Sequence, residues 1–234
     1  MNLEHKVAVV TGGSKGIGKA IALSLADHGV DVAIAARGRD ALDATKREIE
    51  ARGRRAYAFQ GDMSLETDIQ NFIRGTIENM GRMDILVNNA GVGHFANVAE
   101  LTTQDWDTMF DLNVRGLFIA TRESLPHLRQ AGESVIINIA SLAGKNSFIG
   151  GSGYSATKHA VIGFSRCLML EERNNGVRVL VICPGSVATD FGAGPSAKKE
   201  RALRSEDVAD SILHMLKLPQ RAMVSEIDIR PTNP

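Results

Sequence analysis

Short apolar runs alternate with longer amphipathic segments along nearly the whole chain. Turn residues bound most of the apolar runs, which lie at residues 7–10, 30–37, 55–62, 84–89, 135–140, 177–183 and 223–229. Runs of this length are typical of strands buried on both faces. The intervening segments repeat their apolar residues every three or four positions, which predicts helices at residues 19–28, 40–51, 66–80, 102–130, 151–172 and 205–217.

Strands that alternate with helices predict a parallel sheet with helices on both faces. We therefore expect an α/β fold, a single doubly wound, Rossmann-like domain over residues 1–234 with a seven-stranded parallel sheet. No proline-rich linker and no repeat of constant period divides the chain. A TIM barrel fits less well, because it needs eight strand–helix units and usually a longer chain.

Composition narrows the class of partner. The 234 residues carry 27 basic and 27 acidic side chains, with a pI near 7.0, so no net charge attracts nucleic acid or an anionic membrane. We therefore expect a small-molecule substrate. Cys167 and Cys183 imply no disulfide framework and are expected to be buried thiols. We find no signal peptide and no apolar run near the ~20 residues of a membrane span, so we expect a cytoplasmic protein.

A tyrosine and a lysine are the first candidates for chemistry. Tyr154 and Lys158 are one helical turn apart within the expected helix 151–172, so they share a face. An ammonium beside a phenol favours the phenolate and lowers the pKa of the tyrosine. Ser141, at the end of the run 135–140, would add a hydroxyl nearby. A Tyr-x-x-x-Lys pair alone is more often a coincidence on an amphipathic helix.

A glycine turn follows the first expected strand. Gly12, Gly16 and Gly18 have a spacing that differs from the more familiar G-x-G-x-x-G, but the physical logic is the same. Glycines let the backbone approach a pyrophosphate, whose charge is stabilised at the start of the following helix. A simple strand-to-helix connection is the alternative, and the position directly after the first strand favours the phosphate site.

Basic residues mark the end of the second expected strand. An NAD site normally has an acidic residue there for the adenosine ribose, whereas this chain has Arg37. Arg37 and Lys15 could together bind a 2′-phosphate, which favours NADP over NAD. The alternative is that both are solvated surface residues. Asp40 is better explained as a residue at the start of a helix.

Assembled, these residues resemble the short-chain dehydrogenase/reductase family over essentially the whole chain, in particular NADP-preferring carbonyl reductases and members like 3-oxoacyl-[acyl-carrier-protein] reductase. The matching motifs, in the family's order, are Thr11-Gly-Gly-Ser-Lys-Gly-Ile-Gly18, Asn88-Asn-Ala-Gly91, Asn113, Ser141, Tyr154-x-x-x-Lys158 and Pro184-Gly185. The resemblance implies that Asp62 and Met63 contact the adenine and that Val187 and Thr189 contact the nicotinamide carboxamide. The implied NADP(H)-binding residues are Gly12, Ser14, Lys15, Gly16, Ile17, Gly18, Arg37, Asp62, Met63, Asn89, Ala90, Gly91, Tyr154, Lys158, Pro184, Gly185, Val187 and Thr189.

The resemblance also implies a catalytic tetrad of Asn113, Ser141, Tyr154 and Lys158. In that scheme Tyr154 exchanges the proton at the substrate oxygen and Ser141 binds this oxygen. Lys158 binds the nicotinamide ribose and lowers the pKa of the tyrosine, and Asn113 helps to hold a water that relays protons. Without the resemblance, Asn113 could be a polar residue within a long helix and Ser141 a cap or turn residue. No metal is expected.

The expected function is hydride transfer between NADP(H) and a carbonyl or alcohol, with reduction of a ketone or aldehyde favoured. The alternatives are an NAD-dependent alcohol or hydroxy-acid dehydrogenase and a non-catalytic NADP(H)-sensing protein. The ending 223–234 resembles members that act on small hydroxy acids, hydroxy amino acids or assorted carbonyl compounds, and the segment 191–195 predicts a small lid. Candidate residues for the rim of the substrate pocket are His94, Phe95, Leu142, Lys145, Phe148 and Phe191.

Association of like chains is also expected. The resemblance implies a homodimer or homotetramer in which the helices at 102–130 and 151–172 pack against their symmetry mates. Apolar residues wrap much of the circumference of the helix at 102–130, which fits cover on two sides.

Overall fold

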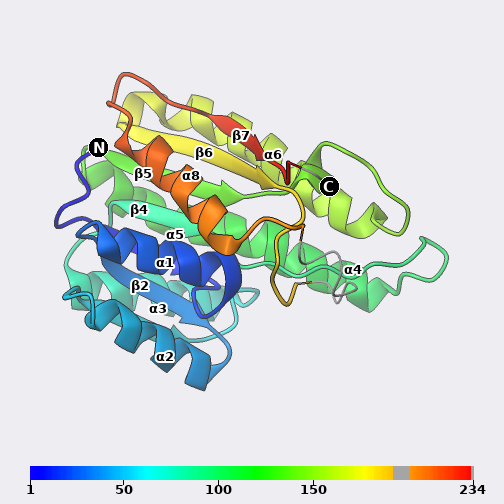
Figure 1. Cartoon of the computed structure of the whole chain (residues 1–234), viewed down its shortest axis with the longest axis horizontal. Coiled ribbons are helices and arrows are strands. Elements are labelled where there is room, and N and C mark those ends of the chain that lie inside the picture. The colour runs from blue at the N-terminus through cyan, green and yellow to red at the C-terminus, as the bar shows by residue number, and fades with distance from the viewer. Residues whose placement is uncertain (192–200, 233–234) are drawn as a thin grey trace.

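The computed structural model describes residues 1–191 and 201–232. Its seven strands form one parallel sheet in the order β3-β2-β1-β4-β5-β6-β7, as predicted (Figure 1). The strand order changes direction between β1 and β4, and in open sheets of this kind ligands bind in the crevice at the carboxyl ends of those strands. The strands are β1 (Val7–Thr11), β2 (Asp31–Ala36), β3 (Ala56–Gln60), β4 (Ile85–Asn88), β5 (Ser134–Ile139), β6 (Val177–Pro184) and β7 (Glu226–Ile229).

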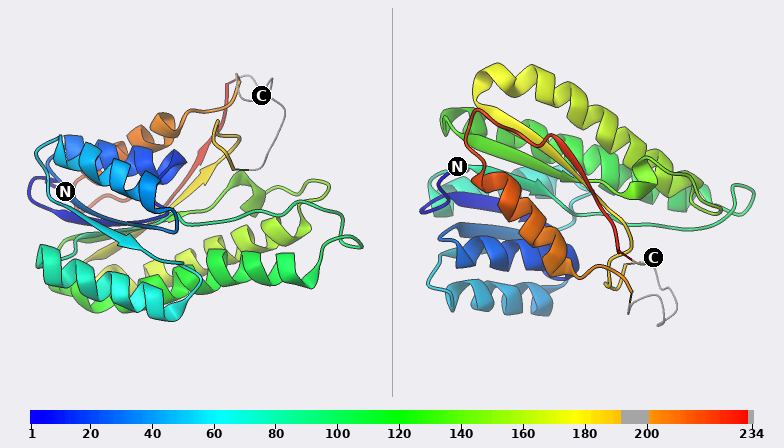
Figure 2. Two further views of the ribbon diagram at one scale, coloured as in Figure 1. Left: turned by 90° about the horizontal axis from the view of Figure 1, so that it is seen from below. Right: turned by 45° about the horizontal axis from the view of Figure 1, so that its top comes forward.

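Helices cover both faces of the sheet, which confirms the doubly wound, Rossmann-like domain. One face carries α1 (Gly16–Asp27), α2 (Arg39–Glu50) and α8 (Ser205–Lys217) (Figure 2). The other face carries α3 (Glu66–Met80), α5 (Leu117–Gln130) and α6 (Ser152–Glu172). Before α5 lies α4 (Thr103–Phe110), which Thr102 caps by accepting a hydrogen bond from the Asp105 N–H at 3.1 Å.

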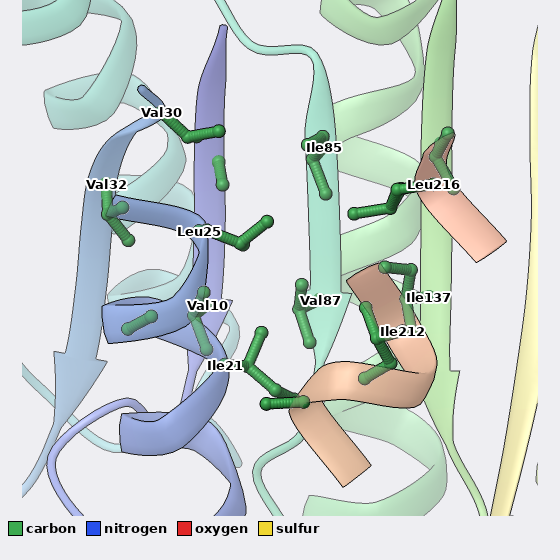
Figure 3. Close-up of a cluster of buried hydrophobic side chains, with 14 of the residues drawn as sticks. Val10, Ile21, Leu25, Val30, Val32, Ile85, Val87, Ile137, Ile212 and Leu216 are labelled. Carbon is green, nitrogen blue, oxygen red and sulfur yellow. The ribbon is translucent and has the colours of Figure 1, made fainter. Parts of the chain in front are cut away.

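The strands at the centre of the sheet are buried on both sides, which explains why their sequences are apolar without interruption. On β1, Val10 packs toward α1 and α8 with Ile21 and Ile212 (Figure 3). Its neighbour Val9 belongs to the core on the opposite face, together with Phe72 of α3. Full burial of an apolar side chain of this kind stabilises the fold by about 1.5–3 kcal/mol.

Most element boundaries lie within two residues of the sequence prediction, and the larger differences are at α1, at β7 and within the segment 102–130. α1 begins at Gly16 rather than at residue 19, because the glycine turn itself forms the first helical turn. The segment 102–130 contains a π-helical stretch, η1 (Asp111–Gly116), between α4 and α5. In this stretch Gly116 lies so close to the Met63 carbonyl oxygen that a side chain would overlap it. β7 begins at Glu226 rather than at residue 223.

The two cysteines differ in exposure. Both are free thiols, and Cys183 is buried as predicted, but Cys167 is exposed, which corrects the prediction for that residue. Ser165 and Leu168 lie on the sheet-facing side of α6. Cys167 is two residues from Ser165, and two residues turn a helix by about 200°, so its side chain points away from the sheet. Among residues 1–191 and 201–232, no helix has the length and apolar character needed to cross a membrane.

The buried carboxylate of Asp84 joins β4 to the start of β1. It accepts hydrogen bonds from Lys6 Nζ at 2.9 Å, Arg82 Nε at 2.8 Å and the Val7 N–H at 3.0 Å. Asp84→Ala removes the acceptor that these donors share. We expect the free energy of unfolding, measured by urea denaturation, to fall by about 2–4 kcal/mol.

The control for this prediction is Asp43→Ala, which breaks the exposed ion pair between Arg39 and Asp43 on α2. Exposed pairs contribute about 0.5 kcal/mol or less. Equal losses of stability in the two variants would contradict the role assigned to Asp84.

Candidate active site

The glycine turn leaves room for a phosphate group. Gly12 and Gly16 have positive φ angles of 67° and 55°, which side chains other than glycine rarely adopt. A side chain on Gly18 would overlap the carbonyl oxygen of Gly12. Because α1 begins at Gly16, the first N–H groups of the helix have no acceptor within it. This arrangement fits the pyrophosphate of a dinucleotide.

Thr11 and Asn89 fasten the glycine turn to the end of β4. The Thr11 hydroxyl accepts hydrogen bonds from the N–H groups of Asn89 at 3.0 Å and Ala90 at 3.1 Å. The Asn89 side-chain amide donates in return to the carbonyl oxygens of Thr11 at 2.9 Å and Gly12 at 3.2 Å. The role of Thr11 was missed from the sequence, although it opens the motif of the glycine turn.

Other predicted nucleotide contacts surround this turn. Thr11 pairs with Ala35 in the sheet, so Lys15 and Arg37 follow neighbouring strands at the same edge, and both are exposed. Asp62 accepts hydrogen bonds from the N–H and hydroxyl of Ser64 at 2.9 and 2.8 Å. Because the side chain of Met63 is buried in the core, a contact with adenine there would use its backbone.

The same edge continues beyond β6. The Gly185 N–H donates to the Ile229 carbonyl at 2.8 Å, which fixes the chain after Pro184, and Val187 forms an isolated bridge with Leu203. The Thr189 methyl group lies over the glycine turn, where a Cβ on Gly16 would be 3.3 Å from it. Elsewhere in the turn, the Ser14 carbonyl accepts from the Thr45 hydroxyl at 3.2 Å, and Ile17 packs against the core.

Tyr154 and Lys158 share one buried face of α6, as predicted. The ammonium of Lys158 lies 5.7 Å from the centroid of the Tyr154 ring. It donates a hydrogen bond to the Ile139 carbonyl oxygen at 2.9 Å, at the carboxyl end of β5. This contact holds the tyrosine helix against the edge of the sheet where the glycine turn lies.

Asn113 lies in the π-helical segment and points toward the same edge. It accepts from the Val92 N–H and donates to the Val92 carbonyl, both at 2.8 Å. It also donates to the hydroxyl of Thr157 on α6 at 3.1 Å, a partner that the sequence did not indicate. A Cβ on Gly91 would lie 3.2 Å from Asn113 Oδ1 and 3.8 Å from Lys158 Nζ, so these residues converge.

The Ser141 hydroxyl has the capping role considered from the sequence and also lies near Tyr154. It caps η2 (Leu142–Gly144) by accepting from the Ala143 N–H at 3.1 Å. It donates to the Pro184 carbonyl oxygen at 3.4 Å, and it lies close enough to the Tyr154 hydroxyl to act on the pKa of that group. A substrate oxygen bound between these two hydroxyls would meet both donors.

The pKa of Tyr154 differs from the sequence-based expectation. Burial raises the pKa of Tyr154 to about 12, and the neighbouring Ser141 hydroxyl offsets this only in part. Burial therefore dominates, and the pKa of Tyr154 lies above its usual value, not below it as the sequence predicted. Burial also lowers the pKa of Lys158 to about 8. At neutral pH the phenol is protonated and the lysine is largely charged.

A buried network of hydrogen-bonded polar side chains lies beneath the site, and the sequence analysis did not identify it. Asn88 Nδ2 donates to Asn138 Oδ1 at 2.9 Å and to the Thr121 hydroxyl at 3.0 Å. Asn138 Nδ2 donates in turn to the hydroxyl of Ser165 on α6 at 2.8 Å. Only tertiary structure brings these residues together, and they connect β4 and β5 to the tyrosine helix.

The candidate rim residues separate into two groups. Phe95 and Phe191 contact the Tyr154 ring, and Phe148 contacts Phe95. We call these three phenylalanines the aromatic rim. His94 and Lys145 instead form ion pairs, and Leu142 packs near Gly185. The predicted lid falls mainly on residues 192–195, which lie outside the described residues.

Comparisons with known proteins agree with this geometry. The model of the short chain dehydrogenase family matches residues 6–200. The 3-oxoacyl-[acyl-carrier-protein] reductase of Synechocystis sp. is 35% identical over 231 residues, with 95% of this chain and 94% of that protein covered. A short chain dehydrogenase from Burkholderia cenocepacia in complex with NADP has a TM-score of 0.91 at 34% identity, covering 99% and 98% of the two chains.

A third similar structure differs in its cofactor. It is a 7α-hydroxysteroid dehydrogenase complexed with NADH and 7-oxo glycochenodeoxycholic acid. The TM-score is 0.92 at 26% identity, with 99% of this chain and 96% of that chain covered.

Burial of Lys158 links stability to pH. Its pKa is about 8 in the folded protein and about 10.4 in an unfolded chain, so unfolding takes up a proton between these values. The contribution of this group to stability therefore rises with pH in that window. Relative to Lys158→Met, we expect the free energy of unfolding of the wild type to rise by about 2 kcal/mol from about pH 7.5 to 9.5. Urea denaturation at each pH measures it, and a constant difference would refute the assignment.

Proposed function

Because the chain belongs to the short-chain dehydrogenase family, we propose that it is an NADP(H)-dependent oxidoreductase that reduces a ketone or aldehyde to an alcohol. One observation carries the proposal. The buried Tyr154 hydroxyl lies beside Ser141, one helical turn from Lys158, at the sheet edge that bears the glycine turn. A proton donor, an oxygen-binding hydroxyl and a dinucleotide cradle therefore lie at one edge of the sheet.

The side chains of the site supply the proton chemistry. The bound cofactor would supply the hydride for the carbonyl carbon. Ser141 donates a hydrogen bond to the substrate oxygen, and Tyr154 donates the proton that completes the alcohol. The Lys158 ammonium stabilises the phenolate that remains, and a proton from solvent restores the phenol. With a pKa of about 12, Tyr154 is protonated at neutral pH and therefore has a proton to donate.

Two exposed cations support NADP as the cofactor. Arg37 follows β2 and Lys15 precedes α1, at the edge where the adenosine ribose of a dinucleotide lies in folds of this class. A guanidinium binds a phosphate through paired hydrogen bonds, and an ammonium adds charge. NAD is the second candidate, because a similar structure contains NADH.

We further propose a homodimer or homotetramer built on the helices at residues 102–130 and 151–172. Trp106 of α4 and Phe118 of α5 each leave a large apolar side chain exposed, at 40% and 44%. Contact with a second copy of the chain would bury them. The two free thiols suit the cytoplasmic location that we propose.

Tyr154→Phe removes the proton donor while keeping the ring and its packing. We expect kcat for carbonyl reduction to fall by about 10²–10⁴-fold. Affinity for NADPH, measured by nucleotide fluorescence, should stay within a few fold. Turnover equal to that of the wild type would refute the assignment, and NADPH binding without reduction of any carbonyl compound by the wild type would indicate a sensor.

Arg37→Asp replaces a phosphate-binding cation with a carboxylate. We expect the ratio of kcat/KM for NADPH to kcat/KM for NADH to fall by about 10–100-fold. This is the size of effect that loss of a hydrogen bond to a charged group produces. Arg39→Asp is the control, because it makes the same charge change two residues away, where the native arginine is paired with Asp43. If both variants change the ratio equally, Arg37 does not recognise the 2′-phosphate.

A further inference from the structure

Three phenylalanines from three separate loops gather around the candidate proton donor. The Phe95 ring meets the Tyr154 ring edge-on at 5.4 Å between centroids, and the Phe191 ring meets it at 5.6 Å. Phe148 lies 6.0 Å from Phe95. The three rings are 43–48% exposed, whereas Tyr154 is buried. The aromatic rim therefore presents apolar surface beside the hydroxyl that we assign to proton transfer.

Local backbone features hold these rings in place. A Cβ on Gly93 would lie 2.9 Å from Phe95 Cζ and 3.0 Å from Phe191 Cζ, so a glycine lets both rings close in. The Ala96 N–H donates to the Gly150 carbonyl at 3.0 Å, which ties the loop of Phe95 to that of Phe148. The aromatic surface is thus positioned by both the β4 loop and the loop before α6.

Among residues 1–191 and 201–232, two basic side chains considered for the rim, His94 and Lys145, contact acidic residues. His94 Nδ1 lies 3.0 Å from Asp105 Oδ1. Lys145 forms ion pairs with Glu226 and Asp228, and hydrogen bonds from Lys145 help to hold the pKa of both carboxyls below their usual range. A substrate carboxylate would have to displace an acidic side chain to pair with either of these two residues. The rim therefore suits an uncharged group.

We propose that the substrate is an uncharged ketone or aldehyde with an aryl or similarly flat apolar group next to the carbonyl carbon, a proposal that rests on the function proposed above. With the carbonyl oxygen between Tyr154 and Ser141, this group lies against the aromatic rim. Offset or edge-on ring contacts add to the free energy gained by burying the apolar area. The hydroxy acids considered from the sequence lack this complementarity.

Matched substrates test the proposal with NADPH as reductant. Methyl benzoylformate and methyl pyruvate differ in the aryl group, and methyl benzoylformate and benzoylformate differ in the charge. We expect kcat/KM to be at least about tenfold higher for the aryl ester than for either comparison, mainly through KM. Equal or higher kcat/KM for methyl pyruvate or for the benzoylformate anion would overturn the proposal.

Variants of the aromatic rim test whether the preference for the aryl ester arises there. Phe95→Ala should lower kcat/KM for methyl benzoylformate by about tenfold or more and change that for methyl pyruvate by less than about threefold. Phe95→Leu keeps most of the side-chain volume, so it controls for a folding defect in Phe95→Ala. It should give a smaller loss of kcat/KM. Val98→Ala is the control, because it removes an exposed apolar side chain from the same loop. Equal losses for both esters would overturn the proposal.

A binding measurement separates this inference from the proposed function. Saturation-transfer NMR should detect the phenyl protons of methyl benzoylformate on the wild type and a weaker signal on Phe95→Ala. If binding follows this pattern but no carbonyl compound is reduced with either cofactor, the proposed enzyme function fails and the aryl site stands. If carbonyl compounds are reduced but the phenyl signal is absent, the inference fails alone.

Discussion

The buried ammonium of Lys158 is the constraint on which the site depends. Removing a charge from water is unfavourable unless a polar partner replaces the lost hydration. Here the partner is the Ile139 carbonyl at the end of β5, and that hydrogen bond fixes how α6 is rotated against the sheet. Tyr154, one turn earlier on the same face, must then lie at the carboxyl edge. The pair is a catalytic candidate because this rotation of α6 brings both side chains to the edge of the sheet that bears the glycine turn.

A second set of hydrogen bonds fixes the other half of the crevice. Thr11 and Asn89 form hydrogen bonds with each other across the ends of β1 and β4. These bonds hold the glycine turn against the loop after β4, which is in turn bonded to Asn113. The buried network of side-chain hydrogen bonds from Asn88 through Asn138 to Ser165 joins β4 and β5 to α6. Because all these strands are parallel, their carboxyl ends gather at one edge, and a few short contacts are enough to align both halves.

The fold could be predicted because its central strands are buried on both faces and have uninterrupted apolar sequences, and because the segments between the strands have helical spacing. The predicted start of α1 lies three residues after the observed start, because glycine has low helix propensity and Gly16 and Gly18 alone are typical of a loop. The π-helical segment was missed because one extra residue per turn hardly disturbs an apolar pattern that already wraps the helix. The partners of Thr11, Thr157 and Asn138 come from segments far apart in the chain, which no spacing rule reveals. The pKa of Tyr154 was predicted in the wrong direction because the sequence shows the neighbouring charge but not the burial.

Burial of Tyr154 also links its chemistry to the surface around it. The tyrosine pKa is raised mainly by loss of water, and Phe95 and Phe191 contact the buried ring directly. Apolar rings that exclude water disfavour the phenolate and keep the proton on the hydroxyl until a substrate oxygen takes it. They also leave Lys158 as the charged group that stabilises the phenolate once the proton has moved. The side chains that suit the site to an apolar substrate are therefore those that hold its proton donor in the protonated state.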